Sequence, residues 1–307
     1  MVTLRDRLRS LRRRIKAALP YVRRREYRLL ERAHMELIEA VDGQASPASA
    51  AQRVVLKPFE MNLTGEVCLF VSHANRPTLK LHVQRHIERL LDAGVHVMLI
   101  ANTDLPADVI AIDGGLLARL SGAWVRQNIG FDFGAWAHAL ASCGDTGRWT
   151  RLFLINDSIV GPLDDGAFTR ILERVRASDA DIVGLTEALA PRRHLQSYFL
   201  VFQARALRST AFSRWFARVQ NWPIKLQVID IYETRLTAIA QACALRCEAL
   251  FPSLTGDPLI ATEPMRRWAE LVQAGFPYLK SHVVARRAND PRVRAWLSAC
   301  GLDATPP

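Results

Sequence analysis

The stretch that decides the fold is residues 67–101, VCLFVSHANRPTLKLHVQRHIERLLDAGVHVMLIA. It begins and ends with short apolar runs, VCLFVS and VHVMLIA, which are typical of buried β-strands. Between them, apolar residues recur at helical spacing, at Leu79, Val83, Ile87, Leu90 and Leu91. Pro77 suits the first turn of this helix, and Gly94 suits its end. A strand, a helix and a strand over this length form a βαβ unit.

The alternation of strands and helices continues along the chain. Apolar runs predict strands ending near Arg126 and covering residues 151–155, 181–186 and 198–202. Helical patterns cover residues 131–143, 168–177, 204–220 and 228–243. We therefore predict an α/β, Rossmann-type fold with a mostly parallel sheet flanked by helices on both faces. Such sheets bind ligands beyond the carboxyl ends of their strands.

The composition is that of a globular protein. Of 307 residues, 50% are hydrophobic and 23% are charged, which excludes bulk disorder and fits one large domain or two small ones. No apolar run approaches the roughly 20 residues that cross a bilayer, and we expect no secretory signal. The five cysteines are odd in number and irregularly spaced, so we expect reduced thiols and a cytoplasmic protein.

The N-terminal segment carries most of the net charge of +11. Residues 1–32 hold twelve Lys or Arg against three acidic residues, and the rest of the chain is close to neutral. An apolar helix face is formed by Leu4, Leu8, Leu11, Ile15 and Leu19. A second helix is predicted over residues 21–40, with a stripe of Leu29, Leu30, Ala33, Leu37 and Ile38. We assign residues 1–41 to a basic helical arm.

Three interpretations of this arm stay open. Its leucines and arginines favour a helix lying on an anionic membrane surface, where each basic residue adds about 1 kcal/mol. Its charge also fits nucleic acid, but aromatic residues are sparse in it, so we expect no nucleic-acid partner. The third is a solvated helix that packs on its own domain or on a partner. Small and polar residues, DGQASPASAA, then predict a linker over 42–60, followed by the main domain over 61–300.

A glycine-bearing turn lies between a predicted strand and helix, in RQNIGFDFGAW, residues 126–136. Gly130 and Gly134 would let a ligand approach the backbone, and the helix N-terminus would offer N–H groups to a phosphate. Arg126 is a candidate phosphate partner, and Asp132 a candidate acceptor from a sugar hydroxyl. The alternative is a tight turn capped by Asn128 or Asp132.

Three polar residues, Asn156, Asp157 and Ser158, abruptly end the apolar run LFLI. A carboxylate beside two oxygen-bearing side chains can hold Mg²⁺ or Mn²⁺ against a diphosphate. Asp157 is the single carboxylate, so it is the candidate metal ligand. The alternative is a helix cap.

Two further clusters carry polar side chains that fit carbohydrate chemistry. Before the strand near residue 200 lie the candidate sugar-binding residues His194, Gln196, Ser197 and Tyr198. The alternative is an ordinary strand edge. Asp230 and Glu233 lie at the start of a predicted helix, where a carboxylate can act as a general base. A carboxylate there also interacts favourably with the helix dipole, by about 0.3–1 kcal/mol.

Taken in order, these clusters resemble a known family. The series RQNIGFDFGAW, LFLINDS, DIVGLTEA, HLQSYFLVF, VIDIYETRLT and GFPYLK is similar to the rhamnan synthesis F family of bacterial polysaccharide glycosyltransferases, over about Val67 to Trp296. The resemblance implies a GT-A-like fold that binds a nucleotide-diphosphosugar. The residues implied to line the donor are Arg126, Asn128, Gly130, Asp132 and Gly134, with the diphosphate facing Asn156, Asp157 and Ser158. Those implied near the acceptor or transferred sugar are His194, Gln196, Ser197 and Tyr198.

The resemblance also implies an activity. We expect transfer of a deoxyhexose, rhamnose from dTDP-rhamnose, to a lipid-linked glycan such as O-antigen or capsule, at the cytoplasmic face of the inner membrane. Glu233 is the first choice for the base, followed by Asp230 and Asp132. Ser158 replaces the second carboxylate of the Asp-x-Asp pattern, which leaves dependence on Mg²⁺ or Mn²⁺ open. The alternative is a non-catalytic carbohydrate-binding or assembly subunit.

Overall fold

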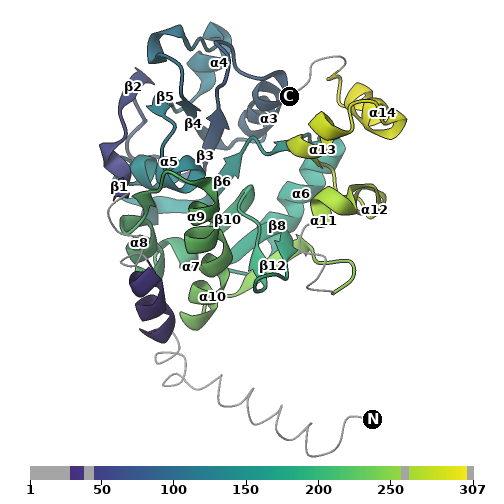
Figure 1. Ribbon diagram of the computed structural model, residues 1–307. Helices are drawn as coiled ribbons and strands as arrows, with labels where there is room; N and C mark the ends of the chain where they lie inside the picture. Colours follow the sequence, from purple (N-terminus) through teal and green to yellow (C-terminus); the bar gives the residue numbers. More distant parts are fainter. Residues whose placement is uncertain (1–27, 38–44, 257–262, 303–307) are drawn as a thin grey trace, which may run out of the picture.

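The computed structural model describes residues 28–37, 45–256 and 263–302 (Figure 1). Its main feature is one large mixed sheet with the strand order β12-β8-β10-β6-β3-β4-β5-β2. In chain order its strands are β2 (Arg53–Lys57), β3 (Gly65–His73), β4 (His96–Thr103), β5 (Gly122–Gln127), β6 (Trp149–Asn156), β8 (Ile182–Ala188), β10 (Phe199–Gln203) and β12 (Cys247–Phe251). The short strand β9 (His194–Leu195) pairs with β8.

Helices cover both faces of this sheet, as the sequence predicts. One face is covered by α3 (Leu81–Asp92), α4 (Gly114–Arg119) and α6 (Asp165–Ala177). The other face is covered by α5 (Phe131–Leu140), α7 (Ala204–Leu207), α8 (Thr210–Ala217), α9 (Lys225–Val228) and α10 (Thr234–Ala242). A π-helical turn, η4 (Ile229–Glu233), joins α9 to α10. The result is a three-layer α/β fold.

The central strands are apolar at successive positions because both of their faces are buried. In β3, Leu69 packs into the core beneath α5, and its neighbour Phe70 packs into the core beneath α3. In β6, Leu154 and Phe153 divide between the same two cores. Successive side chains of a strand point to opposite faces, so a strand between two helical layers needs a continuous apolar run.

The sheet is mixed, which corrects the prediction of a mostly parallel sheet. Strands β6, β3, β4 and β5 are parallel, and β12 is parallel to β8. However, β10 runs antiparallel to both β6 and β8, and β2 runs antiparallel to β5. The connection from β8 to β10 holds no helix, and a parallel pair needs a crossover of a dozen or more residues.

The linker prediction over 42–60 is wrong for the part that the structure describes. Residues 53–57 form β2 at the edge of the main sheet. Ahead of it, β1 (Ser46–Pro47) pairs with β11 (Gln220–Asn221), and a 3-10 turn, η1, covers Ala48–Ala50. Small and polar composition did not reveal these pairings, because the partners lie far along the chain.

Residues 28–37 are helical and belong to the predicted arm. The imidazole of His34 is buried and stacks on Trp215 of α8, with 4.9 Å between ring centroids. Leu30 packs against the same core, whereas Leu29 of the predicted apolar stripe is 56% exposed. This part of the arm therefore packs on its own domain. The more N-terminal part lies outside the described residues.

A small C-terminal layer completes the chain and carries part of the site. It contains α11 (Glu263–Arg266), α12 (Trp268–Gln273), α13 (Ser281–Arg286) and α14 (Pro291–Ala299). Strand β13 (Leu279–Lys280) pairs with β7 (Ile159–Val160), directly after the end of β6. That pairing brings Lys280 to the carboxyl end of the central sheet. The short 3-10 turns η2 (Ala107–Val109) and η3 (Thr146–Arg148) lie in loops.

Candidate functional site

A pocket of about 460 Å³ lies at the carboxyl end of β6. Its walls come from the start of α5, the residues after β6, the segment that enters β10, the turn η4, and β13. The lining side chains are Phe131, Asp132, Phe133, Asn156, Ser158, Gln196, Ser197, Tyr198, Lys225, Val228, Ile229, Glu233, Met265, Lys280, Ser281 and His282. All four predicted clusters therefore contribute side chains to one cavity, as expected of ligand sites in such sheets.

Asp132 is the carboxylate of the pocket with the highest pKa. One of its oxygens, Oδ2, accepts a hydrogen bond of 2.7 Å from Asn156 Nδ2. Burial raises the pKa of Asp132 to about 6, although the charge of Lys225 opposes the rise. A carboxylate with such a pKa can take a proton near neutral pH, which suits a general base.

Glu233 is the second carboxylate of the pocket, and it is already engaged. Its Oε2 accepts hydrogen bonds from the hydroxyl and the backbone N–H of Ser197, and its Oε1 lies 3.6 Å from His194 Nε2. Burial raises the pKa of Glu233, but hydrogen bonds from His194 and Ser197 outweigh burial, so the pKa lies below its ordinary value. Glu233 is therefore ionised and firmly held, which makes it a weaker base than Asp132.

His194 is the imidazole partner of Glu233. Its Nδ1 lies 2.7 Å from the carbonyl oxygen of Arg192 and donates to it. Burial lowers the pKa of His194, but the bonds to Glu233 and to Arg192 outweigh burial and raise the pKa above its ordinary value. The imidazole lies behind Glu233 rather than in the pocket wall, so it positions that carboxylate.

Lys280 places a positive charge in the pocket. Its ammonium lies 3.7 Å from the centre of the Tyr198 ring, a cation–π contact. Burial lowers the pKa of Lys280 to about 8, although Glu233 opposes the fall. Tyr198 in turn hydrogen-bonds with Thr186, and Thr186 bonds with Gln196 at 2.7 Å. Two of the predicted sugar-binding residues, Gln196 and Tyr198, are thus connected through Thr186 in the pocket wall.

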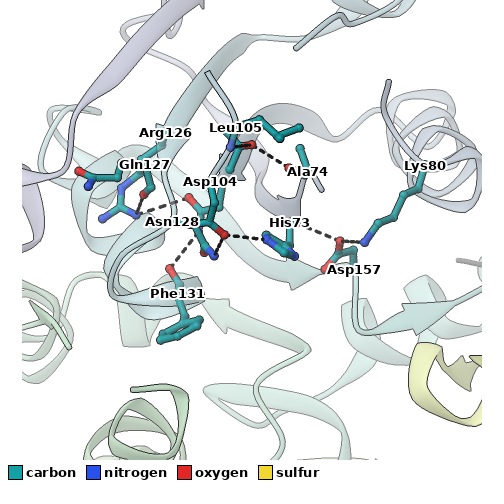
Figure 2. Close-up of polar contacts among 12 residues, drawn as sticks. His73, Ala74, Lys80, Asp104, Leu105, Arg126, Gln127, Asn128, Phe131 and Asp157 are labelled. Carbon is teal, nitrogen blue, oxygen red and sulfur yellow. Dashed lines mark hydrogen bonds and ion pairs between the residues drawn. The ribbon is translucent and has the colours of Figure 1, made fainter. Parts of the chain in front are cut away.

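Asp157 points away from this pocket, toward the ends of β3 and α3. Its Oδ2 accepts from Lys80 Nζ at 2.9 Å, from Ser72 Oγ at 3.0 Å and from the backbone N–H of His73 at 3.0 Å. Figure 2 shows Lys80 and His73 converging on this carboxylate. Asp157 therefore has a lysine as its cationic partner, and within residues 28–37, 45–256 and 263–302 no cluster of three metal-ligating side chains is found.

A second polar group lies beside Asp157, at the carboxyl ends of β3, β4 and β5 (Figure 2). Asp104 Oδ2 accepts from Asn128 Nδ2 at 3.1 Å and lies 3.4 Å from His73 Nε2. Asp104 and His73 are exposed, and Asn128 is half-buried. Sequence reasoning singled out Asn128 and missed the other two. Their position directly after predicted strands was the signal that would have found them.

Arg126 is fully buried, which contradicts the prediction that it pairs with a ligand phosphate. Its guanidinium donates to Asn221 Oδ1 at 2.7 Å and to the backbone carbonyls of Ile129, at 2.8 Å, and Gln127, at 3.0 Å. Burial lowers the pKa of Arg126 to about 10, so it remains a cation at neutral pH. Its donors hold the turn after β5 onto β11.

Gly130 and Gly134 make room for the chain itself rather than for a ligand. A Cβ at Gly130 would lie 2.3 Å from Asn221 Oδ1, and one at Gly134 would lie 2.5 Å from the same atom. Gly130 also has a φ of +70°, a conformation that favours glycine. The glycines therefore let the Asn221 side chain reach Arg126. The prediction that they line the donor is wrong in this respect.

Asp230 is exposed and does not line the pocket, unlike Glu233 three residues later. Ser158 does line it, and its backbone N–H donates to Asn156 Oδ1 at 3.0 Å. Besides Asp104 and His73, sequence reasoning missed Lys80 and Lys225. No local pattern marks Lys80 or Lys225, because each is brought to the site by tertiary packing.

The fold and the site define an α/β protein with a polar, carboxylate-bearing ligand pocket at the carboxyl end of its sheet. A family model described as rhamnan synthesis protein F matches residues 97–297. The chain therefore belongs to this family, and the resemblance stated from its motifs is confirmed. The family description supports a role in polysaccharide synthesis.

Two relatives extend this comparison. The chain is 27% identical over 171 residues to the uncharacterized protein y4gN of Sinorhizobium fredii, a match that covers 54% of this chain and 43% of y4gN. It is 26% identical over 200 residues to the virulence protein VirA of Vibrio anguillarum, a match that covers 63% of this chain and 62% of VirA. The match thus spans about two fifths of the length of y4gN and about three fifths of the length of VirA.

Two further observations concern the helices and the thiols. Among the described residues, no helix is both long and apolar enough to cross a membrane. All five cysteines are free thiols, and Cys68, Cys143 and Cys300 are buried.

Proposed function

We propose that this protein is a glycosyltransferase that moves rhamnose from dTDP-rhamnose to a hydroxyl group of a lipid-linked glycan. The observation that carries the proposal is the pocket at the end of β6, where a carboxylate of raised pKa faces hydrogen-bonding side chains and a lysine. A pocket of this size and polarity fits a sugar ring. The family description is the support for rhamnose, and a GT-A-like fold is part of the same proposal.

The chemistry assigned to the pocket is a single displacement. Asp132 takes the proton of the acceptor hydroxyl, whose oxygen forms a bond to the anomeric carbon of the donor sugar. The bond from that carbon to the diphosphate oxygen breaks, and dTDP leaves with the electron pair. Asp132 replaces Glu233 as first choice for the base, because the pKa of Glu233 is lowered and both of its oxygens have partners.

The proposed donor extends along the carboxyl edge of the sheet. Asp104 and Asn128 supply carboxylate and amide groups that suit the hydroxyl groups of a ribose and the edge of a base. Asp157 is next in the chain to the pocket residues Asn156 and Ser158 and accepts from the backbone N–H of His73, whose ring faces Asp104. The nucleoside, diphosphate and sugar would then occupy neighbouring parts of one edge.

Peripheral attachment to the cytoplasmic face of the inner membrane completes the proposal. The basic charge of residues 1–27 and the lipid-linked nature of the acceptor support it. Deleting residues 1–27 is expected to release the protein from anionic liposomes and leave its folded domain intact. Nucleic-acid affinity with a steep salt dependence, lost on the same deletion, would contradict this assignment.

The test of the activity is release of dTDP from dTDP-rhamnose by the purified chain, through slow hydrolysis or transfer. Asp132→Asn is expected to reduce release by about 100-fold or more, the usual contribution of a general base. Asp108→Asn, at an exposed residue of η2, is the matched control and is expected to leave release unchanged. Binding of a glycan without release from any of a panel of nucleotide sugars would instead identify a non-catalytic assembly subunit.

A further inference from the structure

We infer that Lys80, held in place by Asp157, is the cation that binds the donor diphosphate, in the position where related sites hold a divalent metal. This inference rests on the proposed function and deepens it. It begins from the Lys80–Asp157 ion pair, whose N–O distance is 2.9 Å. Both side chains are largely buried, with 15% and 14% of their surfaces exposed, so the pair is a fixed part of the site.

The residues after β6 do not fit a divalent metal. Asp157 Oδ2 already accepts three hydrogen bonds, one of them from a charged ammonium group. The oxygen of Asn156 accepts from Ser158, and its nitrogen donates to Asp132. Mg²⁺ at such sites is commonly held by one or two free carboxylates together with waters and substrate phosphates, and the single carboxylate here is already paired with a lysine.

The charges around Asp157 favour an anion instead. Lys80 neutralises the carboxylate, and Arg76 lies near enough to lower the pKa of the neighbouring His82. Burial is the larger cause of that lowering, and it brings the pKa of His82 to about 4, so this imidazole is neutral. His73 contributes its backbone N–H to Asp157 and turns its ring to Asp104. Lys80 and Arg76 offset Asp157 and Asp104, so this group of residues carries no net negative charge to repel a diphosphate, and the Lys80 ammonium is the positive group in contact with Asp157.

Lys80 also has N–H groups that can donate to a diphosphate. An ammonium group has three N–H bonds, and within the described part of the chain one of them has an assigned acceptor, Asp157. Lys80 directly precedes α3, whose first-turn amides add partial positive charge at the same end. The ammonium group of Lys80 reaches Asp157 just after the carboxyl end of β6 (Figure 2).

The chemical consequence is a stabilised leaving group. As the bond from the anomeric carbon to the diphosphate oxygen breaks, its electron pair remains on that oxygen. The ammonium of Lys80 stabilises this developing charge by a charge-assisted hydrogen bond, and Asp157 keeps the lysine oriented. The acceptor proton goes to Asp132, so the step balances with the groups already assigned.

The experiment is calorimetric titration of the full chain with dTDP, in excess EDTA and in Mg²⁺, with thymidine as a ligand that lacks phosphates. We expect the Kd for dTDP to agree within about twofold in the two buffers. Lys80→Met is expected to weaken dTDP binding about 10- to 100-fold, the range for one charge-assisted hydrogen bond, and to leave thymidine binding unchanged. Lys80→Arg should retain most of the affinity.

Two variants control for charge. Arg119→Met removes one positive charge from the exposed Arg119–Asp92 pair and is expected to bind dTDP as the wild type does. The double variant Lys80→Met/Asp157→Asn removes the carboxylate that Lys80→Met leaves unpaired. If the lysine itself binds the diphosphate, the double variant still binds dTDP weakly. Recovery of wild-type affinity for dTDP would overturn the inference.

The remaining outcomes separate this inference from the proposed function. Binding of dTDP that requires Mg²⁺ and disappears in EDTA would refute the role of Lys80 and leave a nucleotide-sugar site standing. Failure of dTDP to bind in either buffer would refute both.

Discussion

Replacing Asp132 by Asn is expected to stabilise the folded protein at alkaline pH while it stops turnover. Asn has nearly the same shape as Asp and can still accept the hydrogen bond from Asn156. What it removes is a negative charge that burial disfavours. A general base that is poorly solvated in the folded state reduces stability, and this is a common trade-off between activity and stability.

The magnitude follows from the pKa of Asp132, which burial raises from 3.8 to about 6. The folded state holds the proton of Asp132 more tightly than the unfolded state, so the contribution of this group to stability is fully present below pH 3.8 and is lost as the pH rises through about 6. Each unit between these two pKa values corresponds to about 1.4 kcal/mol, so at pH 8 the ionised Asp132 lowers the free energy of unfolding by about 3 kcal/mol. At pH 5 this cost is about half as large. Asp132→Asn avoids this cost.

The assay is urea unfolding of the wild type, Asp132→Asn and the control Asp108→Asn at pH 5 and pH 8. The expected gain in unfolding free energy for Asp132→Asn is roughly twice as large at pH 8 as at pH 5, and Asp108→Asn should show no such dependence. In the same pH series, kcat/KM of the wild type should rise through about pH 6 and then level off. Equal stability changes at both pH values, or a loss of stability at pH 8, would refute the reasoning.

Three other substitutions test the structure around the site. Arg126→Met should lower the unfolding free energy, measured in urea, by at least about 3 kcal/mol, because it leaves Asn221 and several buried carbonyl groups without a hydrogen-bond donor. Unchanged stability together with weaker binding of the nucleotide sugar would show instead that Arg126 binds the ligand. Gly130→Ala should cost about 1–3 kcal/mol in the same assay, since its Cβ would meet Asn221 at 2.3 Å, and a neutral effect would mean that β11 can move away. Glu233→Gln should shift the NMR titration of His194 to lower pH, because it removes the anion that raises the pKa of His194. An unchanged titration would show that the imidazole and the carboxylate are not coupled.

Much of the fold follows from local patterns. The apolar runs around Leu69 and Phe153 mark strands buried on both faces, and the helical spacing of Val83 and Ile87 marks the helix between two such strands. These patterns are local because burial on one or two faces dictates the period of apolar residues. Strand direction was not readable in the same way. The antiparallel direction of β10 depends on the short connection from β8. Strand β2 is preceded by small and polar residues that resemble a linker.

The site was predicted in outline, and individual roles within it were less accessible. Asp132, Ser197 and Glu233 do line one pocket. Asp132 comes after β5, Ser197 enters the antiparallel strand β10 at the same edge of the sheet, and η4 brings Glu233 to it. Asp132 became the best base only when its burial and the hydrogen bonds of Glu233 could be compared. The relevant solvation is a property of the packed pocket and leaves no mark on the sequence around either residue.

By itself, then, the sequence determined the α/β class, the order of most elements, the family and the segments that carry the site. The tertiary structure alone decided which polar group meets which. Arg126 finds its acceptor 95 positions away at Asn221, and Asp157 finds its cation 77 positions away at Lys80. Apolar periodicity reports how a residue sits relative to its own helix or strand. A hydrogen bond or ion pair requires two side chains within about 3 Å, and only the packing of distant elements fixes that distance.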